Sequence, residues 1–284
     1  MSIEKRPWVD AIAHTTLIIG VMVIAFPIYM AWVASTHTAQ AMAQWPIPLL
    51  PGDQMFENYA AALSGSENSG TRGMSVYRML LVSLISALTI TFGKIIISLI
   101  SAFALVYFRF PFRGLVFWCI FITLMLPVEV RIVPTFKVIA DLGMLNSYAG
   151  LTVPLIASAT ATFLFRQFFK SVPNELVEAA KVDGAGPMRF FIDILIPLSA
   201  TSIAALFVIQ FIYGWNQYLW PLLISTKEDM YPIVVGIRRM IPAGDAQTEW
   251  NVIMATAVLA MAPPLMVVLL MQKWFVKGLV ETEK

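Results

Sequence analysis

The chain has few of the residue types from which enzyme sites and metal centres are built. Its 284 residues include one cysteine and two histidines. A single cysteine excludes an internal disulfide and a cysteine metal cluster, and Cys119 lies in an apolar stretch where we expect it simply to pack. His14 and His37 stand alone at opposite ends of one apolar run. We therefore expect no catalytic residue and no metal ligand.

Charge and phosphate-binding loops are also scarce. Only 13% of the residues are charged, against about 25% in soluble domains. The net charge of +2 is small and scattered, which argues against a nucleic-acid partner. No Gly-x-x-x-x-Gly-Lys-Ser/Thr loop occurs, so the chain is not expected to bind ATP in that way. Any step driven by ATP must be supplied by a partner.

Long apolar runs are what the chain does have. Hydrophobic residues make up 59% of it and its mean hydropathy is +0.78. A helix needs roughly 20 apolar residues to cross a bilayer, and the runs are continuous rather than alternating, which favours helices over barrel strands. The sequence predicts an all-α, polytopic bundle of six transmembrane helices in contact with lipid. The predicted spans are Ala11–Ala34, Tyr77–Tyr107, Gly114–Val138, Gly150–Phe169, Leu198–Leu223 and Val252–Met271.

The distribution of Lys and Arg predicts the orientation. The first run is longer than the apolar part of a secretory signal, so we expect it to be retained as a span. With both termini in the cytosol, eleven basic residues lie on the cytosolic side and five outside, as the positive-inside rule requires. The eleven are Lys5, Arg6, Arg109, Arg113, Arg166, Lys170, Lys181, Arg189, Lys273, Lys277 and Lys284. The expected organisation is a cytosolic N-terminus (1–10), a transmembrane domain (11–272) and a cytosolic tail (273–284).

A polar insert interrupts the spans at residues 170–197. Ser171 or Val172 is expected to cap a helix, Pro173 suits its first turn, and residues 174–183 are mostly good helix formers. Gly184 supplies a C-terminal stop. Pro187 can then open a second helix, so that the two form an L-shaped pair. By composition this element is either a solvated connection or a docking surface, with carboxylates at its rim and small alanines between.

Ionisable residues within spans are costly and usually functional. Lys94 and Glu129 are expected at similar depth in antiparallel neighbours, roughly 21 to 23 Å from the cytosolic end at about 1.5 Å per residue. If they pair, Arg131 remains as a free cation facing a water-filled cavity, which Pro127 and Pro134 would help to shape. The alternative is that Arg131 pairs with Glu129 while Lys94 snorkels towards water.

An aromatic and amide cluster lies at similar depth in the fifth span. It runs from Tyr213 to Pro221, and the residues expected to line the substrate pathway are Trp215, Asn216, Gln217 and Tyr218. Aromatic faces beside amide groups suit a polyol, which offers C–H surfaces and hydroxyls. The alternative is an outer aromatic belt that anchors the span at the membrane surface.

The insert carries a family resemblance. Its Glu178-Ala179-Ala180, Gly184, Ile194 and Pro197 have the spacing of the loop signature of permease subunits in binding-protein-dependent ABC importers. The resemblance implies the MetI-like fold of type I importer permeases in a bacterial inner membrane. It also implies three kinds of protein partner: a sister permease subunit that forms a heterodimer with this chain, two ATP-binding subunits that hold ATP and Mg, and a periplasmic substrate-binding protein.

In such permeases the L-shaped element fits a cleft on the ATPase. The resemblance implies that Glu178 and Asp183 bond to basic or amide groups there, that Ala179 and Ala180 pack, and that Gly184 allows the bend. The element would then act as a lever that transmits ATPase closure to the spans.

Four further stretches, at residues 78–81, 121–131, 159–169 and 275–280, are similar to the family branch that imports sn-glycerol-3-phosphate. The resemblance implies this cargo and leaves glycerophosphodiesters open as additional cargo. Gln217 stands where the carbohydrate-importing branch has an acid, which suits an anionic cargo. Two other functions remain as alternatives: a permease for a neutral sugar or oligosaccharide, and an ion-coupled transporter in which Glu129 and Lys94 relay protons.

Overall fold

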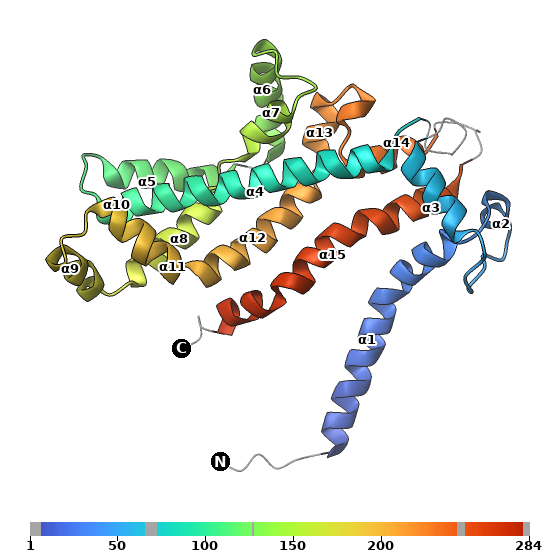
Figure 1. Cartoon of the computed structure of the whole chain (residues 1–284), viewed down its shortest axis with the longest axis horizontal. Helices are drawn as coiled ribbons and strands as arrows, with labels where there is room; N and C mark the ends of the chain where they lie inside the picture. The colour runs from blue at the N-terminus through green and yellow to red at the C-terminus, as the bar shows by residue number, and fades with distance from the viewer. Residues whose placement is uncertain (1–6, 66–72, 127, 243–247, 281–284) are drawn as a thin grey trace. The chain divides into compact units, whose positions relative to one another are not determined.

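The computed structural model describes residues 7–65, 73–126, 128–242 and 248–280, and within them all regular structure is helical (Figure 1). Contacts divide the chain into two compact units. Unit 1 comprises residues 1–77 and 236–262, and unit 2 comprises residues 78–235 and 263–284. Three helices, α4, α14 and α15, run from one unit into the other.

The bounds of the helices follow. The first group is α1 (Pro7–Ala34), α2 (Ala39–Ala43), α3 (Met55–Ser64), α4 (Val76–Tyr107), α5 (Arg113–Ile122), η1 (Thr123–Met125), α6 (Val128–Asp141), α7 (Tyr148–Thr152), η2 (Val153–Leu155) and α8 (Ala159–Ser171). The second group is α9 (Asn174–Val182), α10 (Pro187–Phe190), the π-helical turn η3 (Phe191–Leu195), α11 (Ile196–Leu198), α12 (Ala200–Trp215), α13 (Leu219–Ile224), η4 (Glu228–Met230), α14 (Ile233–Met240) and α15 (Trp250–Val280).

Three described helices are long and apolar enough to cross a bilayer as single pieces: Trp8–Ala34, Val76–Tyr107 and Trp250–Trp274. They confirm the first, second and sixth predicted spans as continuous helices. Two bent pairs of helices are long and apolar enough only when the two members of each pair are taken together. Tyr148–Leu155 and Ala159–Ser171 meet at 46°, and Pro187–Leu198 and Ala200–Ile224 meet at 72°.

The prediction of one continuous helix over Gly114–Val138 is wrong. The structure divides this segment into α5, the short η1 and α6. Leu126, which ends η1, has the extended backbone angles φ −83° and ψ 114°. Pro127 follows in the sequence, and a proline disfavours the helical conformation in the residue before it. Pro134, by contrast, lies inside α6 without ending it.

In unit 1, one buried asparagine ties the outer helix α3 to the end of α1. Asn58 donates hydrogen bonds from Nδ2 to the carbonyl oxygens of Ser35 and His37, at 2.9 and 2.8 Å. Its Oδ1 accepts a 2.8 Å bond from Asn251 of α15. The side chains of Asn58 and Asn251 thus meet where α1 ends, and α3 is a regular helix over Met55–Ser64.

In unit 2, small residues allow α4 and α12 to approach closely. A Cβ added to Gly214 would lie 3.0 Å from the Cα of Ala87, closer than side chains normally allow. Glycine and alanine at such crossings let helix backbones meet in a membrane. This contact brings the middle of α4 against α12, and the candidate site lies between these two helices and their neighbours.

The end of α4 is held to the polar insert by aromatic packing. Phe103 stacks on Phe191 with ring centroids 4.6 Å apart, and Tyr107 meets Phe190 edge to face at 5.3 Å. Both pairs belong to one hydrophobic cluster that also contains Ala180 of α9. The insert is therefore packed against the end of a span rather than attached by its connections alone.

Candidate functional site

A cavity of about 520 Å³ lies in unit 2 between α4, η1, α6, the start of α8 and α12. Its polar lining groups come from five different segments, so it depends on the fold rather than on one local motif. They include Lys94, Thr123, Arg131, Ser158, Thr160, Gln210 and Tyr213.

Lys94 is the buried cation of this cavity, with 6% of its surface exposed. Its Nζ donates a 3.0 Å hydrogen bond to Oε1 of Gln210. The same Nζ lies 3.6 Å from the centroid of the Tyr213 ring, a cation–π contact. Both partners are neutral, so they orient the ammonium group without compensating its charge.

Arg131 lines the same cavity and also an adjoining one of about 90 Å³, which Trp220 borders. Lys94 and Arg131, both predicted as pathway residues, line one cavity. The expected pairing of Lys94 with Glu129 stays a prediction, because the Glu129 side chain lies outside the described part of the structure. Among the described residues that line the larger cavity, two are cations and none is acidic.

Of the aromatic and amide cluster, Tyr213 lines this cavity, whereas Trp215, Asn216, Gln217 and Tyr218 do not. Trp215 is 2% exposed and stacks on Phe211, with centroids 5.8 Å apart, so it belongs to the core rather than to a cargo surface. Asn216 is exposed and ends α12, and Gln217 donates from Nε2 to the carbonyl oxygen of Tyr213 at 3.1 Å. Tyr218, partly exposed, precedes α13.

The cavity residues of α12 lie one to two turns earlier, at Gln210 and Tyr213. We did not predict Gln210 as a site residue. Two signals pointed to it: it is a lone amide in an apolar span, and it lies three residues before Tyr213, which places both on one helix face.

The insert between α8 and α12 forms the predicted pair of helices. Helix α9 ends in a hydrogen-bond pattern typical of a glycine cap: Gly184 N–H donates to Lys181 O at 3.0 Å, and Ala185 N–H donates to Ala180 O at 2.8 Å. Gly184 has φ +71°, a conformation that side-chain-bearing residues rarely adopt. The predicted stop at Gly184 is confirmed.

The predicted N-terminal cap of this helix is wrong. α8 extends to Ser171, whose hydroxyl donates back to the Phe168 carbonyl, and Val172 is extended. Pro173 is the residue that precedes α9, and no side chain caps the helix. The span and the insert are separated by only these two residues, which leaves no room for a separate capping residue.

Four of the five predicted docking residues are exposed: Glu178, Ala179, Asp183 and Gly184. In the described chain neither carboxylate makes an ion pair or a side-chain hydrogen bond. Ala180 is different, because it is 5% exposed and packed in the cluster with Phe103. It secures α9 from within and is not part of the exposed surface.

Two apolar side chains beside these residues were not predicted. Val182 is 87% exposed and Met188 is 62% exposed, on either side of Gly184. The exposed face of the insert, here named the docking face, therefore consists of Glu178, Ala179, Val182, Asp183 and Met188. It combines free carboxylates with uncovered apolar groups, as protein-binding surfaces do.

Comparisons with known proteins agree with this geometry. Residues 94–281 match the family described as "Binding-protein-dependent transport system inner membrane component". The sn-glycerol-3-phosphate transport system permease protein UgpE of Brucella melitensis biotype 1 is 60% identical over 99% of this chain and 100% of its own length. The proteins of the same name from Agrobacterium fabrum and Escherichia coli O157:H7 are each 59% identical over the same shares.

A solved structure described as a bacterial ABC transporter involved in the import of the acidic polysaccharide alginate has the same fold. It superposes with a TM-score of 0.82 at 22% identity, covering 97% of this chain and 100% of the other. By family match and by identity along nearly its whole length, the chain belongs to the inner membrane permease components of binding-protein-dependent transport systems.

Proposed function

We propose that this chain is the permease subunit through which an ABC importer moves sn-glycerol-3-phosphate across the bacterial inner membrane. The observation that most supports this proposal is the cavity lined by Lys94 and Arg131, whose described lining residues include no acid. Relatives about 60% identical over the full length bear the name of this transport system, which supports the same cargo.

The cavity suits a phosphorylated polyol. A phosphate monoester carries a charge of about −1.5 to −2 near pH 7, and the cations Lys94 and Arg131 complement it. Gln210 keeps its amide hydrogens for a cargo hydroxyl while its oxygen accepts from Lys94. The Tyr213 ring offers a face for C–H groups. A glycerophosphodiester has one negative charge fewer, so we expect it to be a weaker cargo.

Partner subunits provide the energy in this proposal. Two ATP-binding subunits hold ATP and Mg and hydrolyse ATP, while this chain carries no catalytic residue and no cofactor of its own. The docking face meets one of them, with Glu178 and Asp183 directed at basic or amide groups and Ala179 allowing close approach. Gly184 sets the angle between α9 and α10, so that closure of the ATPases is transmitted to α12.

The remaining assembly follows from the family. A sister permease subunit completes a heterodimeric pore, and a periplasmic binding protein delivers the cargo. Both termini, residues 1–10 and 273–284, are cytosolic, as the distribution of Lys and Arg favours. The segment 11–272 is then the transmembrane domain, and 170–197 is its cytosolic coupling loop.

The test is uptake of labelled glycerol-3-phosphate by proteoliposomes that contain the co-purified complex. We expect uptake to require ATP, to persist with an ionophore, and to exceed maltose uptake. Arg131→Ala should reduce glycerol-3-phosphate uptake by more than tenfold. The control is Lys137→Ala, which removes a charge from an exposed position of the same helix that does not line the cavity, and it should leave uptake unchanged.

Each alternative has its own outcome. Preferential maltose uptake would assign the chain to a neutral sugar and overturn the cargo. Uptake driven by a proton gradient without ATP would identify a secondary transporter. Glycerol-3-phosphate uptake that is unaffected by Arg131→Ala would remove Arg131 from the pathway without affecting the cargo itself.

A further inference from the structure

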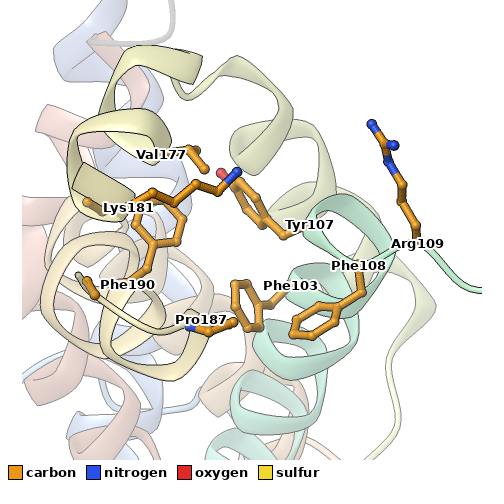
Figure 2. Close-up of a pocket in the computed structure, with 10 residues that line it drawn as sticks. Phe103, Tyr107, Phe108, Arg109, Val177, Lys181, Pro187 and Phe190 are labelled. Carbon is orange, nitrogen blue, oxygen red and sulfur yellow. The ribbon is translucent and has the colours of Figure 1, made fainter. Parts of the chain in front are cut away.

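A second cavity, of about 320 Å³, lies where α4 ends and the insert packs against it. Ten residues line it, of which eight have apolar or aromatic side chains, two are the cations Arg109 and Lys181, and none is acidic. Figure 2 shows the rings of Phe103, Phe108 and Phe190 around this space. The cavity is distinct from the Lys94 site, with which it shares no lining residue.

The two cations are placed differently. The Lys181 side chain extends across the cavity so that its amine points towards the Tyr107 hydroxyl, whereas the Arg109 guanidinium is directed outwards (Figure 2). The Tyr107 hydroxyl donates to the Phe169 carbonyl at 3.1 Å, which holds it in place and leaves its oxygen able to accept. A ligand in this cavity would contact Lys181 next to the apolar lining residues and Arg109 at the opening.

The position in the chain indicates what kind of ligand fits. The span Val76–Tyr107 ends at this cavity, so the cavity lies at the boundary between lipid and water. A free phosphate would gain nothing from eight apolar lining residues. An amphiphile with an anionic head uses both parts, since basic pockets beside membrane helices recognise anionic lipid head groups.

We propose that this cavity is a binding site for an anionic phospholipid. The phosphate contacts Lys181, Arg109 contacts the head group from outside, and the apolar walls take the glycerol backbone and the start of an acyl chain. The cavity has room for about ten water molecules at roughly 30 Å³ each, so it holds this part of a lipid and not the whole molecule. In the topology proposed above, the lipid belongs to the cytosolic leaflet.

The location gives such a lipid a structural role. Val177, Ala180, Lys181 and Ala185 line the cavity from α9 and its cap, while Phe103 and Tyr107 line it from α4. A bound lipid therefore contacts both the docking helix and the span to which that helix is packed. Its loss should loosen α9 against α4.

Photo-crosslinking tests the site on the intact importer. The complex is placed in nanodiscs of phosphatidylethanolamine with a photoactivatable phosphatidylglycerol, and labelled peptides are mapped by mass spectrometry. We expect labelling within 103–109 and 177–190, competed by phosphatidylglycerol and not by phosphatidylcholine, inorganic phosphate or glycerol-3-phosphate. A cation near a membrane surface contributes roughly fivefold to binding an anionic lipid, so Lys181→Gln should reduce labelling by about that factor.

The matched control is Lys170→Gln, which removes a cation from an exposed position of α8 that does not line the cavity. Labelling should then be unchanged. Lys181 lies on the docking helix, so Arg109→Gln, outside that helix, serves as the second variant. Equal labelling after the double change Arg109→Gln and Lys181→Gln would overturn the proposal. Competition by phosphatidylcholine would show that the site binds lipid without preference for an anionic head group. Competition by phosphate or glycerol-3-phosphate would show that it binds a soluble anion instead.

Discussion

Lys94 of α4 donates a 3.0 Å hydrogen bond from Nζ to Oε1 of Gln210 on α12, across 116 residues of sequence. The bond joins two helices that also touch at Gly214 and Ala87. A buried ammonium group whose hydrogen-bond acceptor is a neutral amide is oriented by that bond but is not neutralised by it.

The first prediction concerns this pair. Lys94→Gln removes the buried charge, and a hydrogen bond to a charged group contributes about 1.5–3 kcal/mol, so the KM for glycerol-3-phosphate should rise by roughly 10- to 100-fold. Gln210→Glu is the matched variant, because it keeps Lys94 and compensates its charge. Both should weaken uptake in proteoliposomes. An unchanged KM in Gln210→Glu would show that the Lys94 charge does not attract the cargo.

The second prediction concerns the cap of α9. Gly184→Val forces a branched residue into φ +71°, a left-handed conformation that costs about 1–2 kcal/mol. We expect ATP hydrolysis to continue while uptake is lost, with normal amounts of protein in the membrane.

Gly186→Val provides the control for the cap. Gly186 has φ −71°, and a Cβ there meets nothing within 4 Å, as at Gly184. The two changes add the same side chain to open space and differ in backbone conformation. ATPase activity and uptake are measured on the same preparations. Normal coupling in Gly184→Val would argue against the proposed lever.

The third prediction separates the aromatic residues of α12. Trp215 is buried in the core, so Trp215→Ala should lower stability by about 3–5 kcal/mol, visible as a lower Tm of the solubilised complex. Tyr213 is 36% exposed and faces Lys94. Tyr213→Ala should instead raise the KM for glycerol-3-phosphate with little change in Tm. A raised KM for Trp215→Ala together with a lowered Tm for Tyr213→Ala would show instead that Trp215 contacts the cargo.

The fourth prediction concerns Asn146, which links the turn after α6 to the loop after α13. Its Oδ1 accepts from Thr226 N at 2.6 Å and from Lys227 N at 2.9 Å, and its backbone has φ +52°. Asn146→Ala removes both bonds and should cost about 2–3 kcal/mol. Asn146→Asp keeps the acceptors and should be milder. Equal Tm values for the two variants would mean that these bonds contribute little.

Local sequence signals predicted much of the architecture. The three unbroken spans follow from continuous apolar runs, and the end of α9 follows from Gly184 after a run of helix formers. The break after Met125 was also encoded locally, by Pro127, although the apolar run continues through it. Hydropathy alone does not mark a proline, and Pro127 and Pro134 were the sequence signals for a distortion of this predicted span.

Less of the candidate site could be predicted from the sequence. Lys94 and Arg131 were identified as site residues because ionisable groups in apolar spans are costly and usually functional. The partner of Lys94 was not, since Gln210 is brought beside it by the packing of α4 on α12. Trp215 was assigned to the pathway for its chemistry, but the direction of its side chain is set by contacts with Phe211 and depends on the fold.

The helical segments Pro187–Leu198 and Ala200–Ile224 meet at 72°. Ser199 lies between them, so it is the pivot about which α12 would rotate as a lever. Gln210 lies eleven residues beyond the pivot, about 16 Å along the helix at ~1.5 Å per residue. Turning α12 by about 10° would therefore displace Gln210 by about 3 Å. That displacement is as long as the hydrogen bond to Lys94, so a small rotation of α12 relative to α4 would break this bond.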